Sequence, residues 1–399
     1  MAADNELSWQ TLTAELINEQ EKRPHPPAAE EPPERKAGFD FSIVSKYRGQ
    51  LFGASIILIM IFHYFNGVLE LHEKQDTLYM ISYSYVNIVG SIGVEIFLFL
   101  SGMGLYFSYT KNSNTNEFYK KRFTRILIPY LMYAPIVWLI KDCIINGKPF
   151  TKWFYDLSLG SFWLSGNRLI WFIGAICLFY ALFPLLYAVV TSKHYRLGSA
   201  MLTGFFLLTL FCAYTEAKKK YEISEVGFSR IVIFFIGIYM GRLIYEKRKI
   251  QVWHIITFSG IFAAKALLAL FQIKKKFSIV PGSVKTVINV FGSSFGSRMA
   301  AAVFSLGYIF VIILILSLLK CKWLDKFLIK VGSISLELYM CHVTTNGIIT
   351  AEGSLDINEP LVYAMSMSIA VVLAIILHIS SNAVIKKITI KATPHDHRL

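Results

Sequence analysis

The fold of this chain is decided by the stretch Lys46–Leu69, KYRGQLFGASIILIMIFHYFNGVL. From Leu51 onward it is apolar over the length that a helix needs to cross a bilayer, which is about 20 residues. One ionisable residue, His63, stands well inside this apolar run. An imidazole is unfavourable in hydrocarbon unless it faces a partner or a wet cavity, so an intramembrane histidine indicates a functional position.

The composition of the whole chain agrees with this interpretation. The chain has 399 residues, of which 55% are hydrophobic and 17% are charged, whereas soluble domains carry about 25% charged residues. Several apolar stretches reach about 18 residues or more, which is typical of transmembrane helices. The stretches are continuously apolar rather than alternating, which argues against a membrane β-barrel. We therefore predict an all-α, polytopic transmembrane bundle.

The net charge of +14 has a simple explanation in such a protein. Lysines and arginines gather in short loops, as orientation signals do, and no basic, solvated domain suggests a nucleic-acid partner. The cysteines show no CxxC spacing and mostly lie in apolar runs, so we expect packing residues, with neither a disulfide framework nor a metal site. They are Cys143, Cys177, Cys212, Cys321 and Cys341.

Three regions follow from the distribution of apolar residues. Residues 1–45 are acidic and rich in Pro and Glu, which predicts a flexible cytoplasmic tail and no cleavable signal peptide. Residues 46–385 form the predicted transmembrane domain, and residues 386–399 a cytoplasmic C-terminal tail. The domain contains about ten candidate spans, namely 51–69, 86–109, 126–145, 168–190, 197–214, 230–245, 252–272, 299–319, 331–350 and 360–385.

The basic loops orient the predicted bundle. With ten spans, the loops before 126, after 245 and before 331 and the C-terminal tail fall on one side, which the positive-inside rule makes cytoplasmic. We accordingly expect a plasma-membrane protein with both termini in the cytoplasm. The loop 273–298 is also basic although it falls on the other side. Either the span count fails near this loop or the loop attracts an anionic partner, and we favour the second explanation.

Three ionisable residues fall at one depth of the predicted bundle. A helix rises about 1.5 Å per residue, which puts His63 about 18 Å above the inner edge of a roughly 30 Å core. The same arithmetic puts Glu95 about 16 Å and His342 about 16–17 Å above that edge. Each could be a packing residue whose polar groups are satisfied. Their shared level instead predicts a site in which Glu95 orients His63 as a general base.

Three arginines stand near the inner ends of the first and third spans: Arg48, Arg122 and Arg125. Each could be a plain positive-inside anchor. The guanidinium group also offers forked donors that match phosphate oxygens, which indicates an anion-binding cluster. Arg48 and His63 lie within roughly 60° of the same helix face. Arg48 could therefore hold the cytoplasmic end of a ligand whose other end approaches His63.

Four stretches carry a likeness to a known family. They are RGQLFGASIILIMIFHYF (48–65), GVEIFLFLSGMGLYFS (93–108), FYKKRFTRILIPYL (118–131) and VGSISLELYMCHV (331–343). In order and spacing they resemble the membrane-embedded acyltransferase family 3, whose members transfer acyl groups across a membrane. The likeness covers the chain from about Lys46 to the last span.

This resemblance implies a function and roles for particular residues. It implies acyl-CoA, usually acetyl-CoA, as the cytoplasmic donor, and a hydroxyl of a sugar or glycan as the acceptor. It implies that His63 is the essential histidine, that Glu95 stands where the family commonly has Asp, and that arginines near the inner face assist the donor. Phe52 occupies a position where the family often has Arg, so the role of Arg48 departs from the common pattern.

Four further residues complete the candidate site. Tyr339 and His342 could stabilise an oxyanion or bind the acceptor, and Glu337 lies about two turns below His342. Trp171 could stack on a sugar ring or serve as an interfacial anchor.

Two rival functions remain. One is a proton-coupled transporter of a small anionic or sugar-like solute, in which His and Glu relay protons. The other is a non-catalytic membrane scaffold, in which the shared level of these residues is chance.

Overall fold

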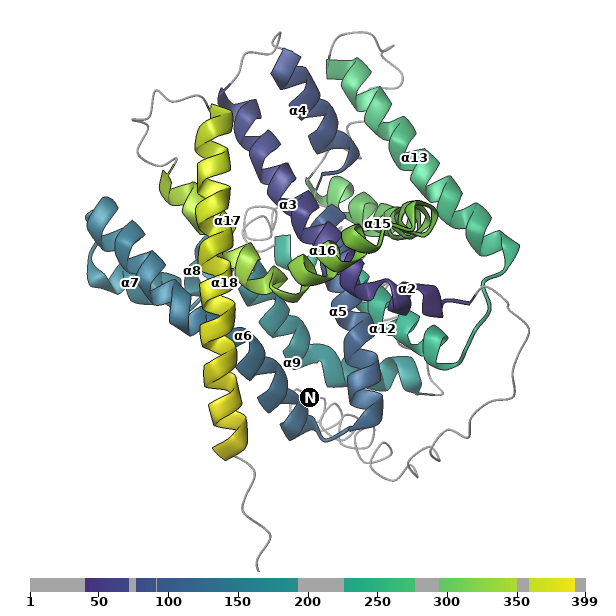
Figure 1. Ribbon diagram of the computed structural model, residues 1–399, viewed down its shortest axis with the longest axis horizontal. Coiled ribbons are helices and arrows are strands. Elements are labelled where there is room, and N and C mark those ends of the chain that lie inside the picture. The colour runs from purple at the N-terminus through teal and green to yellow at the C-terminus, as the bar shows by residue number, and fades with distance from the viewer. Residues whose placement is uncertain are drawn as a thin grey trace, which may run out of the picture.

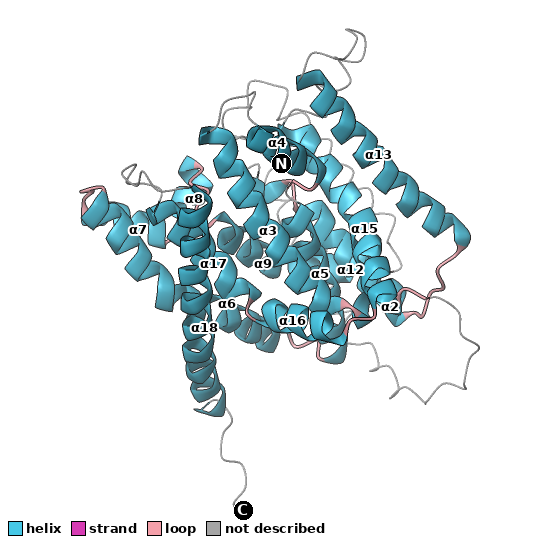
Figure 2. Cartoon of the chain, turned by 45° about the horizontal axis from the view of Figure 1, so that its top comes forward, coloured by secondary structure: helices cyan, strands magenta, loops and turns pink. Residues whose placement is uncertain are grey.

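The computed structural model describes residues 40–71, 77–90, 92–192, 226–276, 294–349 and 359–391. Within these ranges the chain is a bundle of helices (Figure 1), and the β pairing is limited to an isolated bridge between Asp40 and Lys249. The predicted all-α class is confirmed. The colouring by secondary structure shows the same arrangement from a second direction (Figure 2).

The described helices follow one another along the chain with short connections. They are α2 (Ser42–Lys46), α3 (Arg48–Leu71), α4 (Thr77–Ile88), α5 (Ile92–Lys111), α6 (Thr115–Trp138), the π-helix η1 (Leu139–Ile145), α7 (Phe150–Leu157), α8 (Gly160–Ser165), α9 (Trp171–Thr191), α12 (Ile231–Tyr245), α13 (Val252–Lys276), α15 (Ser294–Leu319), α16 (Lys322–Ser333), α17 (Ser335–Ile349) and α18 (Glu359–Lys391).

Seven helical stretches in the described chain are long and apolar enough to cross a membrane. They are Arg48–Leu69, Ile92–Lys111, Thr115–Ile145, Trp171–Thr191, Val226–Tyr245, Ala301–Leu319 and Leu361–Ile388. The prediction of about ten spans is slightly higher. Span 197–214 lies outside the described residues, as does most of the loop 273–298. Span 252–272 falls on α13, whose apolar part is shorter, and span 331–350 on α17, which has only 15 residues.

Helix α5 is the centre of the bundle, because 78% of its apolar span is buried against 22% for the peripheral α18. Its neighbours approach closely at glycines, as is common between membrane helices. A Cβ at Gly237 of α12 would lie 2.1 Å from the carbonyl oxygen of Phe99. A Cβ at Gly93 would lie 2.7 Å from that of Ser55 on α3. These contacts hold α3 and α12 against α5.

The predicted span 86–109 is divided into two helices. Gly90 has a φ of 49°, which is a left-handed conformation that glycine adopts readily, and it separates α4 from α5. Glu95 therefore lies in the first turn of α5. A carboxylate is favourable there, because the N-terminal end of a helix carries a partial positive charge.

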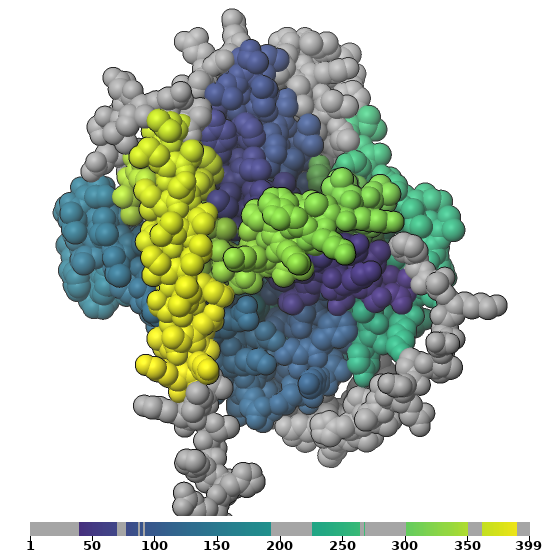
Figure 3. Space-filling view, in the orientation of Figure 1, coloured from purple at the N-terminus to yellow at the C-terminus, as the bar shows by residue number. Residues whose placement is uncertain are grey.

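The predicted span 331–350 is divided as well. Helix α16 ends at Ser333 and α17 begins at Ser335. Figure 3 shows α16, in light green, lying across the bundle between α18 and α2. It packs on the first turns of α3 so closely that a Cβ at Gly53 would lie 2.0 Å from the carbonyl oxygen of Leu328. The junction of α16 and α17 is thereby placed beside the start of α3.

Candidate active site

Two histidines from distant parts of the chain meet inside the bundle. The rings of His63 on α3 and His342 on α17 have centroids 5.3 Å apart and are tilted by 57°. His342 is fully buried, and its Nδ1 lies 2.8 Å from the carbonyl oxygen of Leu338. Because a carbonyl can only accept, Nδ1 carries the proton and Nε2 keeps its lone pair. That Nε2 has no hydrogen-bond partner among the described residues.

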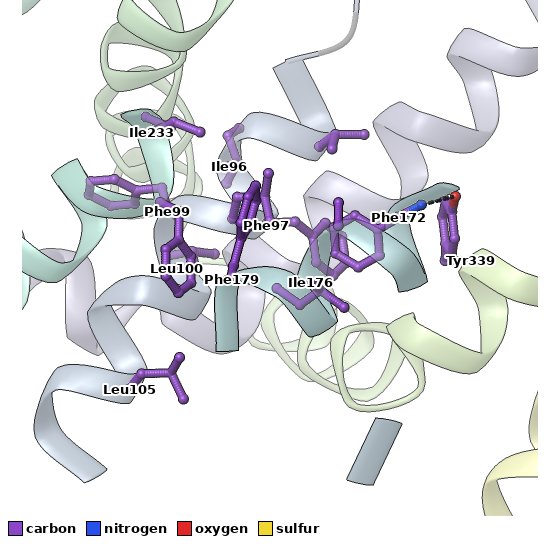
Figure 4. Close-up of a cluster of buried hydrophobic side chains, with 14 of the residues drawn as sticks. Ile96, Phe97, Phe99, Leu100, Leu105, Phe172, Ile176, Phe179, Ile233 and Tyr339 are labelled. Carbon is purple, nitrogen blue, oxygen red and sulfur yellow. Dashed lines mark hydrogen bonds between the residues drawn. The ribbon is translucent and has the colours of Figure 1, made fainter. Parts of the chain in front are cut away.

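Tyr339 extends this cluster toward α9. Its ring centroid is 5.9 Å from that of His342 and 5.1 Å from that of Phe172. The Tyr339 hydroxyl oxygen accepts a hydrogen bond from the backbone N–H of Phe172 at 3.3 Å, which is the dashed line in Figure 4. The start of α9 is thus joined to α17 beside the histidine pair.

Glu95 has an ion-pair partner that the sequence analysis did not single out. Its Oε1 lies 3.0 Å from Nε of Arg230, and both side chains are buried. Arg230 also donates from Nη1 to the carbonyl oxygen of Val226 at 2.6 Å, and its guanidinium lies 4.7 Å from the ring centroid of Trp171. Two predicted site residues, Glu95 and Trp171, are therefore held together by Arg230. A lone arginine at the end of an apolar run was the available signal.

A cavity of about 370 Å³ opens where α3, α5, α6 and α9 meet the α16–α17 junction. All three predicted arginines line it, and no acidic residue does. The lining residues are Arg48, Phe52, Phe97, Ser101, Gly104, Leu105, Arg122, Arg125, Ile126, Phe172, Ile176, Tyr180, Gly332, Ser333, Ser335 and Leu336. The structure thus brings Arg48, Arg122 and Arg125 to one basic cavity.

The positions of these arginines are shaped by their neighbours. The guanidinium of Arg48 lies 5.0 Å from the ring centroid of Phe52. A Cβ at Gly104 would lie 2.4 Å from Nη2 of Arg48, so the absence of a side chain at Gly104 leaves room for the guanidinium. Nε of Arg122 is buried and has no hydrogen-bond partner among the described residues. This cavity therefore holds positive charge and donor capacity that the described protein leaves free.

Aromatic side chains separate the cavity from the histidine pair. Phe97 and Phe172 line the cavity, and Phe172 contacts Tyr339, which in turn contacts His342. Figure 4 shows Phe97, Phe172 and Tyr339 side by side in the buried cluster. Along α3, Arg48 and His63 are separated by about 22 Å of helix. A ligand bound by Arg48 must therefore be long to reach the histidines.

Glu337 is engaged elsewhere. This buried carboxylate lies 3.0 Å from Nδ1 of His378 on α18, and the Nδ2 of Asn382 lies 2.9 Å from Nε2 of the same imidazole. The pair joins α17 to α18, and the sequence analysis did not identify His378.

The fold and the buried imidazole pair are those of a polytopic membrane enzyme, and comparisons with known proteins specify its family. The family model described as "Acyltransferase domain" matches residues 53–379. The chain belongs to this acyltransferase family. It is 25% identical over 186 residues to Acyltransferase MdmB of Streptomyces mycarofaciens, a match that covers 40% of this chain and 48% of that protein. The chain thus spans about half the length of this curated relative. No solved structure matches.

Proposed function

We propose that this protein is an O-acyltransferase that moves an acyl group, in the simplest case acetyl, from cytoplasmic acyl-CoA to a hydroxyl of a sugar, surface glycan or lipid-linked saccharide. The observation that carries the proposal is the cavity lined by three arginines on one side of a buried histidine pair. Family membership makes the reaction an acyl transfer. The basic loops favour a plasma-membrane protein whose cavity faces the cytoplasm.

The cavity suits the donor by charge. Arg48, Arg122 and Arg125 offer forked N–H donors to phosphate oxygens, and the lining adds no acidic residue that would compete. In the proposed complex the phosphates lie at the arginines and the acyl-bearing arm passes the aromatic layer toward His63. A long, anionic donor such as acyl-CoA matches both the charge of the cavity and its distance from the histidines.

The histidine pair supplies the acid–base chemistry of the proposal. His63 accepts the proton of the acceptor hydroxyl as that oxygen attacks the thioester carbonyl. The tetrahedral adduct then collapses, the carbon–sulfur bond breaks, and the imidazolium returns the proton to the leaving thiolate. Tyr339, whose oxygen accepts from Phe172, keeps its own proton to donate to the developing oxyanion. His342 offers an unprotonated Nε2 that can position His63 or the acceptor.

Glu95 and Trp171 take supporting roles in this proposal. Glu95 and Arg230 form a buried ion pair close to the start of α9, and Trp171 packs on the guanidinium. We assign this group to the acceptor side, where Trp171 can contact a sugar ring. Glu95 then influences His63 through the surrounding structure.

Mass spectrometry of surface glycans from cells with and without the protein tests the proposal. We expect one acyl mass to disappear without the protein and to stay absent when only His63→Ala is supplied, although this variant inserts into the membrane normally. The rival transporter function predicts instead that sealed vesicles take up solute without any acyl donor. Unchanged glycans together with donor-independent uptake would overturn the proposal.

A further inference from the structure

A second hollow lies away from the proposed site, between α2, α13 and α15. It is a groove of about 240 Å³, and Figure 2 shows α13 standing beside α15 with α2 at their lower ends. Its lining is apolar apart from two serines and includes no charged residue. Ile43, Ile250, Phe258, Phe310 and Leu314 are among the residues that form it.

Lysines surround one end of this groove. Lys247 and Lys249 immediately precede Ile250, which lines the groove, and Lys320 and Lys322 follow soon after Ser317, which also lines it. All four are exposed, and none makes an ion pair in the part of the chain that the structure describes. We call these four residues the lysine rim.

Contacts of α2 bring the two halves of the rim to one place. Asp40 pairs with Lys249 through the backbone bridge, and the ring of Phe41 lies 5.1 Å from that of His254 at the start of α13. Helix α2 also contacts α15, and Ile43 of α2 lines the groove. The start of α13 and the end of α15 therefore meet around α2.

The nearest described carboxylate on the α12–α13 connection does not neutralise the rim. Glu246 forms ion pairs with Arg242 at 2.6 Å and with Arg248 at 3.0 Å. Although partial burial raises it, the hydrogen bonds from Arg242 and Arg248 hold the pKa of Glu246 below its usual value. The glutamate is thus an anion already shared by two arginines, and the rim keeps its positive charge.

Two lysines of the rim occupy backbone positions that favour glycine. Lys247 has a φ of 53° and Lys320 a φ of 47°, and only one further non-glycine residue in the described chain has a positive φ. Both follow the last turn of a helix, where glycine is the usual residue. Lysine is retained at both positions despite the backbone strain, which suggests that the charge has a use there.

The rim lies at the level where lipid headgroups are expected. Helix α2 leads directly into α3, whose apolar run begins at Leu51, so the groove end is close to the membrane boundary. Trp253, which is 56% exposed, stands at the same end, and tryptophan is enriched at that boundary. An apolar groove that ends in a cluster of lysines is complementary to a lipid with an apolar chain and an anionic headgroup.

We propose that this groove is a binding site for one anionic phospholipid, with an acyl chain between α13 and α15 and the phosphate on the lysine rim. The site stands independently of the acyl-transfer proposal. Bilayer lipid surrounds the apolar surface of every membrane protein, and the lysine rim is what distinguishes this site from general lipid contact.

Native mass spectrometry of the full-length protein in detergent tests the site. Phosphatidylglycerol and phosphatidylcholine with the same acyl chains are the two probes. We expect a retained adduct with phosphatidylglycerol, and a loss of that preference by about tenfold or more in Lys249→Gln/Lys320→Gln/Lys322→Gln, because each lysine near a membrane surface attracts anionic lipid. The matched control is Lys386→Gln/Lys387→Gln at the end of α18, where both lysines are exposed and the preference should persist.

Two further variants separate charge from folding and chain from headgroup. Lys320→Gly removes a rim charge but suits the positive φ, so it should weaken phosphatidylglycerol binding while the melting temperature holds or rises. Ser259→Phe fills the groove and should reduce retention of both lipids. Equal retention of the two lipids by the wild-type protein, or an unchanged preference in the triple variant, would overturn the proposal.

Discussion

The rings of His63 and His342 lie with their centroids 5.3 Å apart, one on α3 near the beginning of the described chain and the other on α17 near its end. The proton of His342 is fixed on Nδ1 by the carbonyl of Leu338. The neighbouring His63 therefore faces a neutral imidazole that is fully buried. Such a pair can hold and return one proton, and a first prediction follows from this property.

Replacing His63 by Ala should abolish acyl transfer with little effect on folding. The ring is half-buried rather than part of the fully buried core, and a positioned general base contributes roughly 10²–10⁴ in rate. The rate of acyl transfer to the acceptor, at saturating donor, is the measurement. His342→Gln should reduce the same rate less severely, since Gln retains a hydrogen-bonding group at that position. Wild-type transfer by His63→Ala would contradict the assigned role.

Gly104→Ala should weaken donor binding. The added Cβ would lie 2.4 Å from Nη2 of Arg48, so the guanidinium must move out of its place in the cavity. We expect KM for the donor to rise, by about tenfold if one charge-assisted phosphate contact is lost, while kcat changes less. Gly67→Ala on α3 is the control, because nothing lies within 4 Å of its added Cβ. Equal KM values for the two variants would argue against Arg48 as a donor ligand.

Gly53→Ala should destabilise the protein. Its Cβ would lie 2.0 Å from the backbone carbonyl oxygen of Leu328, and backbone atoms of a packed helix cannot yield as a flexible side chain can. Thermal unfolding in detergent should show a lower midpoint than wild type and than Gly67→Ala. A midpoint equal to that of Gly67→Ala would mean that α16 does not pack against α3 at this point.

The ion pair between Glu95 and Arg230 should behave as a coupled unit. Removing one partner leaves a buried charge uncompensated, which typically costs about 3–5 kcal/mol. Glu95→Gln and Arg230→Met should each lower the unfolding midpoint strongly, and the double variant should lose much less than the two single losses combined. Additive losses in this double-mutant cycle would show that the two side chains are not energetically coupled.

The elements that sequence reasoning found share one property, which is that the signal is local. The apolar run from Leu51, the basic run around Arg122 and Arg125 and the isolated histidines can each be identified within one helix. Helical rise alone predicted that His63 and His342 share a level, and the structure brings their rings together. The prediction of one cluster of three arginines also agrees with the cavity that the structure shows.

The elements that it missed depend on a second segment far along the chain. Arg230 is the ion-pair partner of Glu95 because α12 packs on α5 at glycines, and one helix cannot announce its neighbour. The break at Gly90 and the junction between α16 and α17 lie inside runs that hydropathy treats as continuous. The pairing of Glu337 with His378 likewise requires α17 and α18 to be adjacent.

The sequence by itself determined that this chain is a helical membrane protein, which residues lie at which depth, and which family its motifs resemble. Burial in hydrocarbon forces each apolar segment into a helix, and a helix has a fixed rise, so depth follows from position alone. Only the tertiary structure decided the partners of Glu95, Glu337 and His63, and the enclosure of the arginine cavity. Which faces of the helices meet depends on side-chain packing between distant segments, because lipid and protein interior are similarly apolar and hydropathy does not distinguish them.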